Sequence, residues 1–148
     1  MKVREAIMDH LGDFFRKNAG RYGIEMVFLY GSWAGGLPRR DSDIDIAVVF
    51  SEDLLTDEQI FEHITEISLD LSWTLHSEVN VLAIYSDFRK PMLYYNAIVF
   101  GIPVFLKDFH QYVDLKNEAV YQMEDFSIFA RDWQLRVAKH NLEELQHA

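Results

Sequence analysis

Two carboxylates, Asp43 and Asp45, stand two residues apart where a hydrophobic run begins. In an extended strand such residues project from the same face, roughly 7 Å apart along the chain. Neighbouring carboxylates repel each other unless a cation lies between them. Hard divalent ions such as Mg²⁺ take oxygen ligands from one or two carboxylates together with substrate phosphates. The pair therefore predicts a divalent metal site with Asp43 and Asp45 as its ligands.

A turn that suits phosphate groups precedes this pair. Gly31 has no side chain to obstruct a triphosphate, and Ser32 offers it a hydroxyl and a backbone N–H. A helical turn starting at Trp33 would add the partial positive charge of its N-terminal amides. Trp33 itself either stacks on a base or fills the space beside the turn. Arg40 lies in the same loop and is either a phosphate contact or a solvated loop charge, as most surface arginines are.

This spacing resembles the signature of the polymerase β-like nucleotidyltransferase superfamily. It consists of Gly31-Ser32, ten further residues and Asp43-x-Asp45, set between two apolar runs. With its short length, the chain looks like a minimal nucleotidyltransferase (MNT) of the kind paired with HEPN-domain toxins in prokaryotic toxin–antitoxin modules. The resemblance covers residues 27–105. It implies a mixed sheet, a two-metal Mg²⁺ site and ATP as substrate. It further implies transfer of AMP to a hydroxyl, expected to be a tyrosine, of a HEPN ribonuclease toxin.

The third expected strand departs from this family pattern. Enzymes of the family commonly carry an acidic residue there, whereas this chain has Asn80. An amide can ligate a metal through its carbonyl oxygen but cannot accept a proton as a base. Glu78 lies on the same face by strand alternation and is either a substitute for the missing acid or an exposed residue at the start of the strand. His76 shares this expected face.

The candidate residues thus fall into three groups. The catalytic candidates are Asp43, Asp45 and Glu78, and the metal ligands are Asp43 and Asp45. The nucleotide-binding candidates are Gly31, Ser32, Arg40 and Asn80. Two alternative functions stay open: a catalytically weak nucleotide-binding antitoxin that acts by complex formation, which Asn80 favours, and a small-molecule transferase of the aminoglycoside type. The length of 148 residues counts against the second alternative, because such enzymes usually carry a longer helical domain.

Composition narrows the class of protein further. The net charge of −10 disfavours a grip on a long nucleic acid. The chain has no cysteine, which excludes disulfides and cysteine-based zinc sites. No apolar run approaches the roughly 18 residues of a membrane span, so a cytoplasmic location is expected. The chain length indicates one domain over residues 1–148; whether it forms a homo-oligomer stays open.

The periodicity predicts elements that can hold these residues in place. We expect a helix ending near Gly20, strands over residues 25–30, 44–50 and 79–85, and an edge strand over residues 103–106. Thr56 to Gln59 reads as a capping box for a second helix, and Pro91 and Gly101 as the limits of a third. The fold class is α+β, an α/β sandwich with a small mixed sheet flanked by helices. The core spans about residues 20–106, and a helical extension over 108–148 has these candidate buried positions: Tyr112, Leu115, Ala119, Tyr121, Phe126, Phe129, Trp133, Val137 and Leu145.

Overall fold

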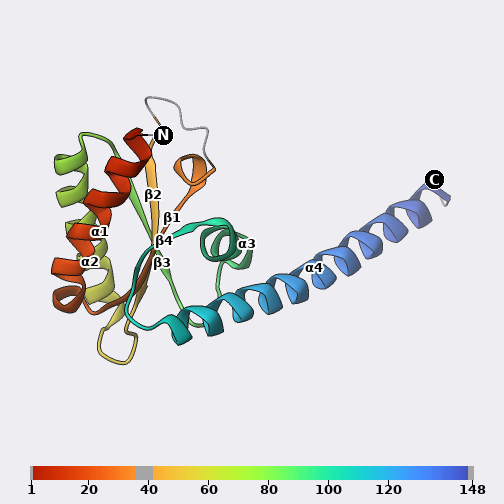
Figure 1. The fold of residues 1–148 in the computed structure, drawn as a ribbon. Coiled ribbons are helices and arrows are strands. Elements are labelled where there is room, and N and C mark those ends of the chain that lie inside the picture. Colours follow the sequence, from red (N-terminus) through yellow and green to blue (C-terminus); the bar gives the residue numbers. More distant parts are fainter. Residues whose placement is uncertain (1, 36–41, 147–148) are drawn as a thin grey trace.

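The computed structural model describes residues 2–35 and 42–146. Four strands and the helices around them follow one another along these residues (Figure 1). In chain order they are α1 (Lys2–Tyr22), β1 (Ile24–Tyr30), η1 (Gly31–Trp33), β2 (Ile44–Phe50), α2 (Asp57–Leu75), β3 (Val79–Ile84), α3 (Pro91–Tyr95), η2 (Asn96–Phe100), β4 (Ile102–Leu106) and α4 (Phe109–Gln146). Among the described helices, none is both long and apolar enough to cross a membrane.

The sheet is mixed, as expected, with the strand order β3-β2-β1-β4. β1 pairs antiparallel with β2 and with β4, whereas β2 and β3 run parallel. A parallel pair needs a crossover connection, and α2 supplies it. The end of β1 and the starts of β2 and β3 therefore meet at one edge of the sheet.

Helices cover both faces of the sheet (Figure 1). α1 and α2 pack on one face. There Leu11, Phe15 and Ile67 are fully buried against every second residue of the strands, such as Val27 and Leu29 of β1. α3, η2 and the first half of α4 pack on the other face, over a second core that includes Phe28 and Ala47. The alternation of each strand thus decides which face a side chain joins.

The sequence expectations for the central elements hold with small shifts. β2 spans the expected residues, and β4 is the edge strand. The capping box forms, because the Thr56 hydroxyl accepts from the Gln59 amide and the Gln59 side chain accepts from the Thr56 amide. α1 runs two residues past Gly20, to Tyr22. The helix that begins at Pro91 ends at Gly101, but its second half, Asn96–Phe100, is a π-helix.

The prediction of buried positions in the C-terminal extension was largely wrong. Ala119 is buried, and Tyr112 and Leu115 are half-buried against the second core. The later positions are exposed, because α4 continues past the body of the protein with no other element of the described residues beside it (Figure 1). These exposed positions are Tyr121, Phe126, Phe129, Trp133, Val137 and Leu145. Helical periodicity identified an apolar face but could not say whether another element covers it.

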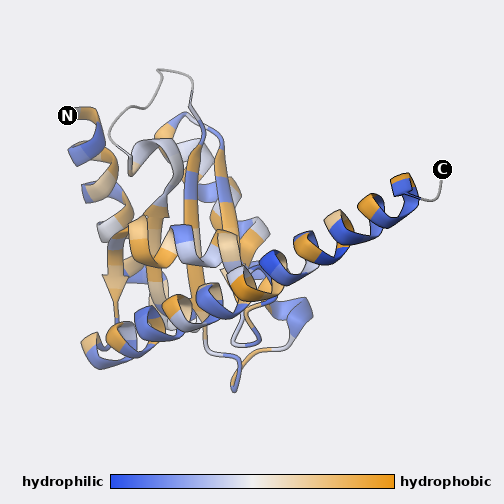
Figure 2. Ribbon diagram, turned by 90° about the vertical axis from the view of Figure 1, so that its right-hand side faces the viewer, coloured by the Kyte–Doolittle hydropathy of each residue, from blue (hydrophilic) through white to orange (hydrophobic). Residues whose placement is uncertain are grey.

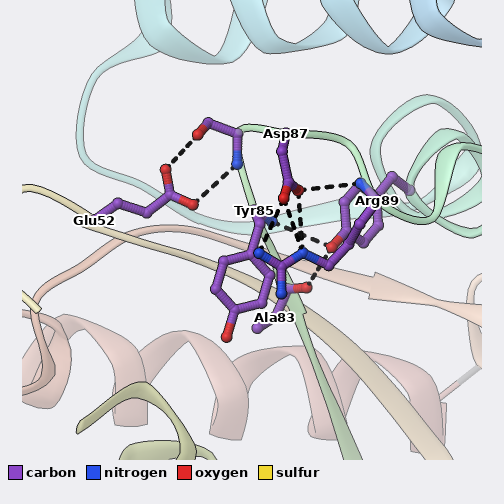
Figure 3. Close-up of polar contacts among 7 residues, drawn as sticks. Glu52, Ala83, Tyr85, Asp87 and Arg89 are labelled. Carbon is purple, nitrogen blue, oxygen red and sulfur yellow. Dashed lines mark hydrogen bonds and ion pairs between the residues drawn. The ribbon is translucent and has the colours of Figure 1, made fainter. Parts of the chain in front are cut away.

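A polar network fastens the connection between β3 and α3 (Figure 3). The Glu52 carboxylate accepts from the Ser86 amide at 3.0 Å and from its hydroxyl at 2.5 Å. Arg89 pairs with Asp87 at 3.0 Å, and its guanidinium lies over the Tyr85 ring, 3.8 Å from the centroid. Hydrogen bonds to this arginine hold the pKa of Asp87 below its usual range.

The buried Tyr94 then fixes α3 against the sheet. The Tyr94 hydroxyl donates to the Ala83 carbonyl at 3.0 Å and accepts from the Tyr85 amide at 3.3 Å. Burial raises the pKa of Tyr94, so the hydroxyl stays a neutral donor. This anchoring holds the α3–η2 segment beside the sheet edge where the candidate residues lie.

Candidate active site

Three neighbouring strands place Tyr30, Asp45 and Asn80 in one row. Tyr30 is the partner of Asp45 in the β1–β2 ladder, and Asp45 is the partner of Asn80 in the β2–β3 ladder. Residues that pair across a ladder project from the same face of the sheet. This is the face that α3 and η2 cover, because Ala47, two residues after Asp45, lies in the core beneath them. The row therefore stands at the rim of that core.

The Asn80 amide joins the two carboxylates. Its Nδ2 donates to Asp45 Oδ1 at 3.1 Å and lies 3.5 Å from Asp43 Oδ2. Asp43 and Asn80 are exposed and Asp45 is half-buried. The expected convergence of Asp43 and Asp45 thus occurs, and Asn80 is the side chain that stands between them and relieves their repulsion.

Gly31 approaches Asp45 so closely that a side chain here would displace the carboxylate. Its φ is +75°, a conformation that side chains with a Cβ rarely adopt. A Cβ built at this position would lie 2.6 Å from Asp45 Oδ2. The missing side chain therefore leaves room for the carboxylate as well as for a ligand.

Ser32 and Trp33 complete the turn that follows β1. Gly31–Trp33 forms a short 3₁₀ turn in which Ser32 is exposed, so its hydroxyl and amide are accessible to a ligand. The Trp33 side chain is only 6% exposed and donates through Nε1 to the Ser42 carbonyl at 3.2 Å. Of the two interpretations of Trp33, the structural one applies: the indole fills the space under the turn and ties it to the start of β2.

Tyr30 stands beside Asp45 with an unusually weak acidity. Burial of the phenol, with the negative charge of Asp45 as the smaller cause, raises the pKa of Tyr30 to about 12. The hydroxyl therefore remains a protonated donor through the whole neutral range. Sequence reasoning missed this residue, although its place at the end of the strand before Gly31 is visible in the chain.

The remaining candidates lie in different situations. Glu78 precedes β3 and is exposed; its backbone carbonyl accepts from the Ile44 amide at 2.9 Å, which puts it at the same sheet edge as Asp43. Within the described residues, its side chain has no hydrogen bond or ion pair. His76 does not share the strand face, because it caps α2 in the left-handed conformation with φ 53°. Arg40 lies outside the described residues.

A hollow opens beside Gly31 that the sequence did not indicate. It has a volume of about 410 Å³ and lies between the turn and the α3–η2 segment. Leu93, Asn96 and Phe100 line it from the helical side, opposite Tyr30, Gly31, Ala34 and Gly35. Asn96 and Phe100 are the first and last residues of the π-helix, and such segments are frequent at functional sites. On its helical side the hollow offers the apolar side chains of Leu93 and Phe100 and the amide of Asn96.

The donor set can be tested against a divalent metal ion. In residues 2–35 and 42–146, no group of three or more His, Cys, Asp and Glu side chains is arranged around a common point. Mg²⁺ does not require one, because it keeps water ligands and takes phosphate oxygens from its substrate. Two carboxylates with accessible oxygens, and an amide whose rotation would present its carbonyl, fit this requirement. Asp43, Asp45 and Asn80 are thus the residues that would hold the ion.

The fold and this edge of the sheet define a nucleotidyltransferase domain. Residues 10–110 match the family described as polymerase beta, nucleotidyltransferase, and the chain belongs to this family. The match includes the Gly31-Ser32 turn, the Asp43–Asp45 pair and the whole α3–η2 segment. Among curated proteins, none matches the sequence significantly.

Solved structures with a similar fold include chains from toxin–antitoxin complexes. A chain from a toxin–antitoxin structure with AMP-PNP has a TM-score of 0.67 and 18% identity, over 85% of this chain and 97% of that one. A chain from the MntA–HepT toxin–antitoxin structure has a TM-score of 0.65 and 16% identity, over 90% and 97%. A third comes from the tri-AMPylated HEPN toxin of Shewanella oneidensis in complex with its MNT antitoxin; it has a TM-score of 0.63 and 15% identity, over 88% and 98%. At these identities the similarity establishes the fold.

Proposed function

We propose that this protein is the antitoxin of a HEPN–MNT module, and that it transfers AMP from ATP to a tyrosine hydroxyl of its HEPN toxin. The observation that carries the proposal is the Asp43–Asp45 pair held beside the Gly31-Ser32 turn. The family membership supports nucleotidyl transfer in general. The folds of the MNT-containing complexes support the toxin as acceptor, since one of them holds an AMPylated HEPN toxin.

In the proposed reaction, the tyrosine oxygen attacks the α-phosphorus of ATP. A new P–O bond forms to the tyrosine, the bond to the β-phosphate breaks, and pyrophosphate leaves. The phenol proton passes to a base, for which Glu78 is the candidate because Asn80 cannot accept a proton. Bound Mg²⁺ would supply charge neutralisation at the phosphates and activation of the attacking oxygen. The chain itself orients the groups that react.

The groups near the end of β1 and the starts of β2 and β3 would each help to orient the ATP. Ser32 and the amides of the turn would donate to the triphosphate, as N-terminal amides do for phosphates. The hollow lined by Leu93, Asn96 and Phe100 lies next to Gly31 and is large enough for a nucleoside. An apolar wall with one amide suits a planar base, which Phe100 can stack on. We place the nucleoside of ATP there, and Arg40 as a further phosphate contact.

The partner and the setting follow from the same proposal. A protein acceptor fits a site whose carboxylates, Asp43 and Asp45, lie at an accessible end of the sheet. The net charge of −10 would attract a basic partner and disfavours long nucleic acids. HEPN toxins act on RNA inside the cell, so we place the antitoxin in the cytoplasm.

Incubation with radiolabelled ATP and the HEPN toxin encoded beside it tests this function. Mg²⁺ should permit label transfer to the toxin, with a mass gain of one adenylate for each modified tyrosine. A chelator should abolish the transfer. If label from another nucleoside triphosphate transfers better, the assignment of ATP is wrong. If no nucleotide is transferred but the toxin is still inhibited, the protein neutralises its toxin without nucleotidyl transfer.

A second function is favoured by one observation. Asn80 occupies the position where a third acid is expected, and its amide nitrogen lies 3.1 Å from Asp45 Oδ1 and 3.5 Å from Asp43 Oδ2. An antitoxin that binds nucleotide and neutralises its toxin by complex formation would need no base. Inhibition of the toxin in the presence of a chelator, with no mass change, would favour this second function.

A further inference from the structure

The second half of α4 has no covering element in the described chain. α4 contacts α3 and η2 near its start, and beyond them it projects away from the body (Figure 1). From residue 124 to residue 146, every side chain is exposed except the half-buried Ala130. Apolar residues nevertheless recur along this part of the helix (Figure 2). Exposed apolar surface of this kind is typical of a protein–protein contact.

One apolar row runs along α4 from the body into the projecting part. We call it the α4 seam; its steps of three and four residues keep all members on one side of the helix. It consists of Tyr112, Leu115, Ala119, Met123, Phe126, Ala130, Trp133 and Val137. The first members pack on the second core, with Ala119 buried. The later members continue the same row without a partner, and Trp133 is 60% exposed.

We propose that the second half of the α4 seam pairs with the same segment of a second copy of the chain, antiparallel, about a twofold axis between Arg131 and Asp132. In this register Ala130 faces Trp133 of the second copy, and Phe126 faces its Val137. Each large side chain meets a smaller one, which is how helices interdigitate in antiparallel pairs. The twofold axis repeats both contacts, so four apolar positions of each helix are covered.

A parallel pairing of the same seam fits less well. It would place Trp133 against Trp133 and Ala130 against Ala130, which produces a clash at one level and a gap at the other. In the antiparallel register, the residues flanking the seam are also compatible. Phe129 lies beside Arg136 of the second copy, where a cation–π contact is available. No two like charges oppose each other beside the seam.

The opposite side of α4 provides a built-in control. Tyr121, Ile128, Leu135 and Leu142 repeat every seven residues on the face away from the α4 seam. Leu135 is 63% exposed, so it matches Trp133 in exposure but lies outside the proposed contact. The inference concerns association alone and does not depend on nucleotidyl transfer.

Sedimentation velocity of the full chain over a range of concentrations tests the association. We expect a monomer–dimer equilibrium with a dissociation constant in the micromolar range. Trp133→Glu should raise this constant at least about tenfold, since a buried tryptophan at a contact is often a dominant residue, whereas Leu135→Glu should leave it within about twofold. Unchanged far-UV circular dichroism would show that both variants stay folded. A monomer at all concentrations, or equal effects of both substitutions, would overturn the proposal.

Cross-linking tests the register, because the chain has no cysteine of its own. Phe126→Cys and Val137→Cys variants are each treated with a short bismaleimide, alone and mixed. The antiparallel pair predicts a cross-linked dimer only in the mixture. Dimers from each variant alone would show a parallel pair and overturn the proposal. If the chain stays monomeric and the introduced cysteines are protected from the maleimide only when the HEPN toxin is added, this surface binds the toxin and the proposal is overturned.

Discussion

The side-chain nitrogen of Asn80 lies 3.1 Å from Oδ1 of Asp45, across the parallel pairing of β2 and β3. This contact gives the acidic edge a neutral donor where a third carboxylate would add repulsion. The Asp43–Asp45 pair is therefore compatible with a stable fold before any cation binds. The same amide is the group on which the choice between the two proposed functions depends.

The first prediction concerns Asn80→Asp. The substitution replaces hydrogen bonds to two carboxylates by repulsion, so without metal we expect a loss of roughly 1 kcal/mol in the free energy of unfolding. Acidification should reduce this loss, since protonation removes the repulsion. Mg²⁺ should raise the melting temperature of the variant more than that of the natural protein. Equal shifts with Mg²⁺ in both proteins would show that Asn80 does not face the metal site.

A second prediction separates Asn80 from Glu78 as the residue that limits chemistry. If Glu78 is the base, Glu78→Ala should lower transfer to the toxin by about 10²-fold or more. If the missing acid limits the rate, Asn80→Asp should instead accelerate transfer, and adding Glu78→Ala should change little. Single-turnover rates at saturating ATP distinguish the two cases. Insensitivity to both changes in an active protein would mean that the base lies elsewhere.

The third prediction concerns the carboxylates themselves. Asp43→Asn and Asp45→Asn each remove a charge that the metal needs, so Mg²⁺-dependent ATP binding in calorimetry should be largely lost. The melting temperature without metal should stay the same or rise, because the substitution relieves repulsion. Asp53→Asn is the matched control, being an exposed carboxylate after the other end of β2. Full binding by both site variants would place the nucleotide elsewhere.

Gly31→Ala gives a fourth prediction, which rests on backbone geometry. The positive φ and the approach to Asp45 should together cost about 1–3 kcal/mol of stability. Gly20→Ala is the control, since a Cβ there meets nothing within 4 Å and alanine favours a helix by up to roughly 1 kcal/mol. Denaturant unfolding should therefore show opposite signs for the two substitutions. A neutral Gly31→Ala would mean that the turn relaxes away from Asp45.

The fifth prediction is a pH dependence from Tyr30. Its pKa in the folded protein is about 12, above the ordinary 10.0, so the folded state holds the proton more tightly than the unfolded chain. The stability that this provides is complete below pH 10 and is lost as the pH rises towards 12. Tyr30→Phe should flatten the fall in melting temperature above pH 10. The rest of the fall should remain, because the pKa values of Tyr22, Tyr85 and Tyr94 are also raised.

Much of the sheet could be predicted from the chain, because short apolar runs between turn residues have few other solutions. The limits of β2, the capping box at Thr56 and the helix from Pro91 to Gly101 all follow from local rules. The predictions that failed needed information from elsewhere in the chain. Strand alternation predicted His76 on the same face as Glu78. It is instead the C-cap of α2, because this helix continues to Leu75.

The sequence by itself determined which residues carry charge and which face of each strand they share, since both are properties of local spacing. It therefore predicted Asp43 and Asp45 as a pair and Gly31-Ser32 as the turn. Only the tertiary structure decided that Tyr30, Asp45 and Asn80 form one row, because strand register is set by side chains distant in sequence. The hollow beside Gly31 and the uncovered half of the α4 seam were decided in the same way: whether an apolar surface is covered depends on what packs against it, and no local pattern encodes that.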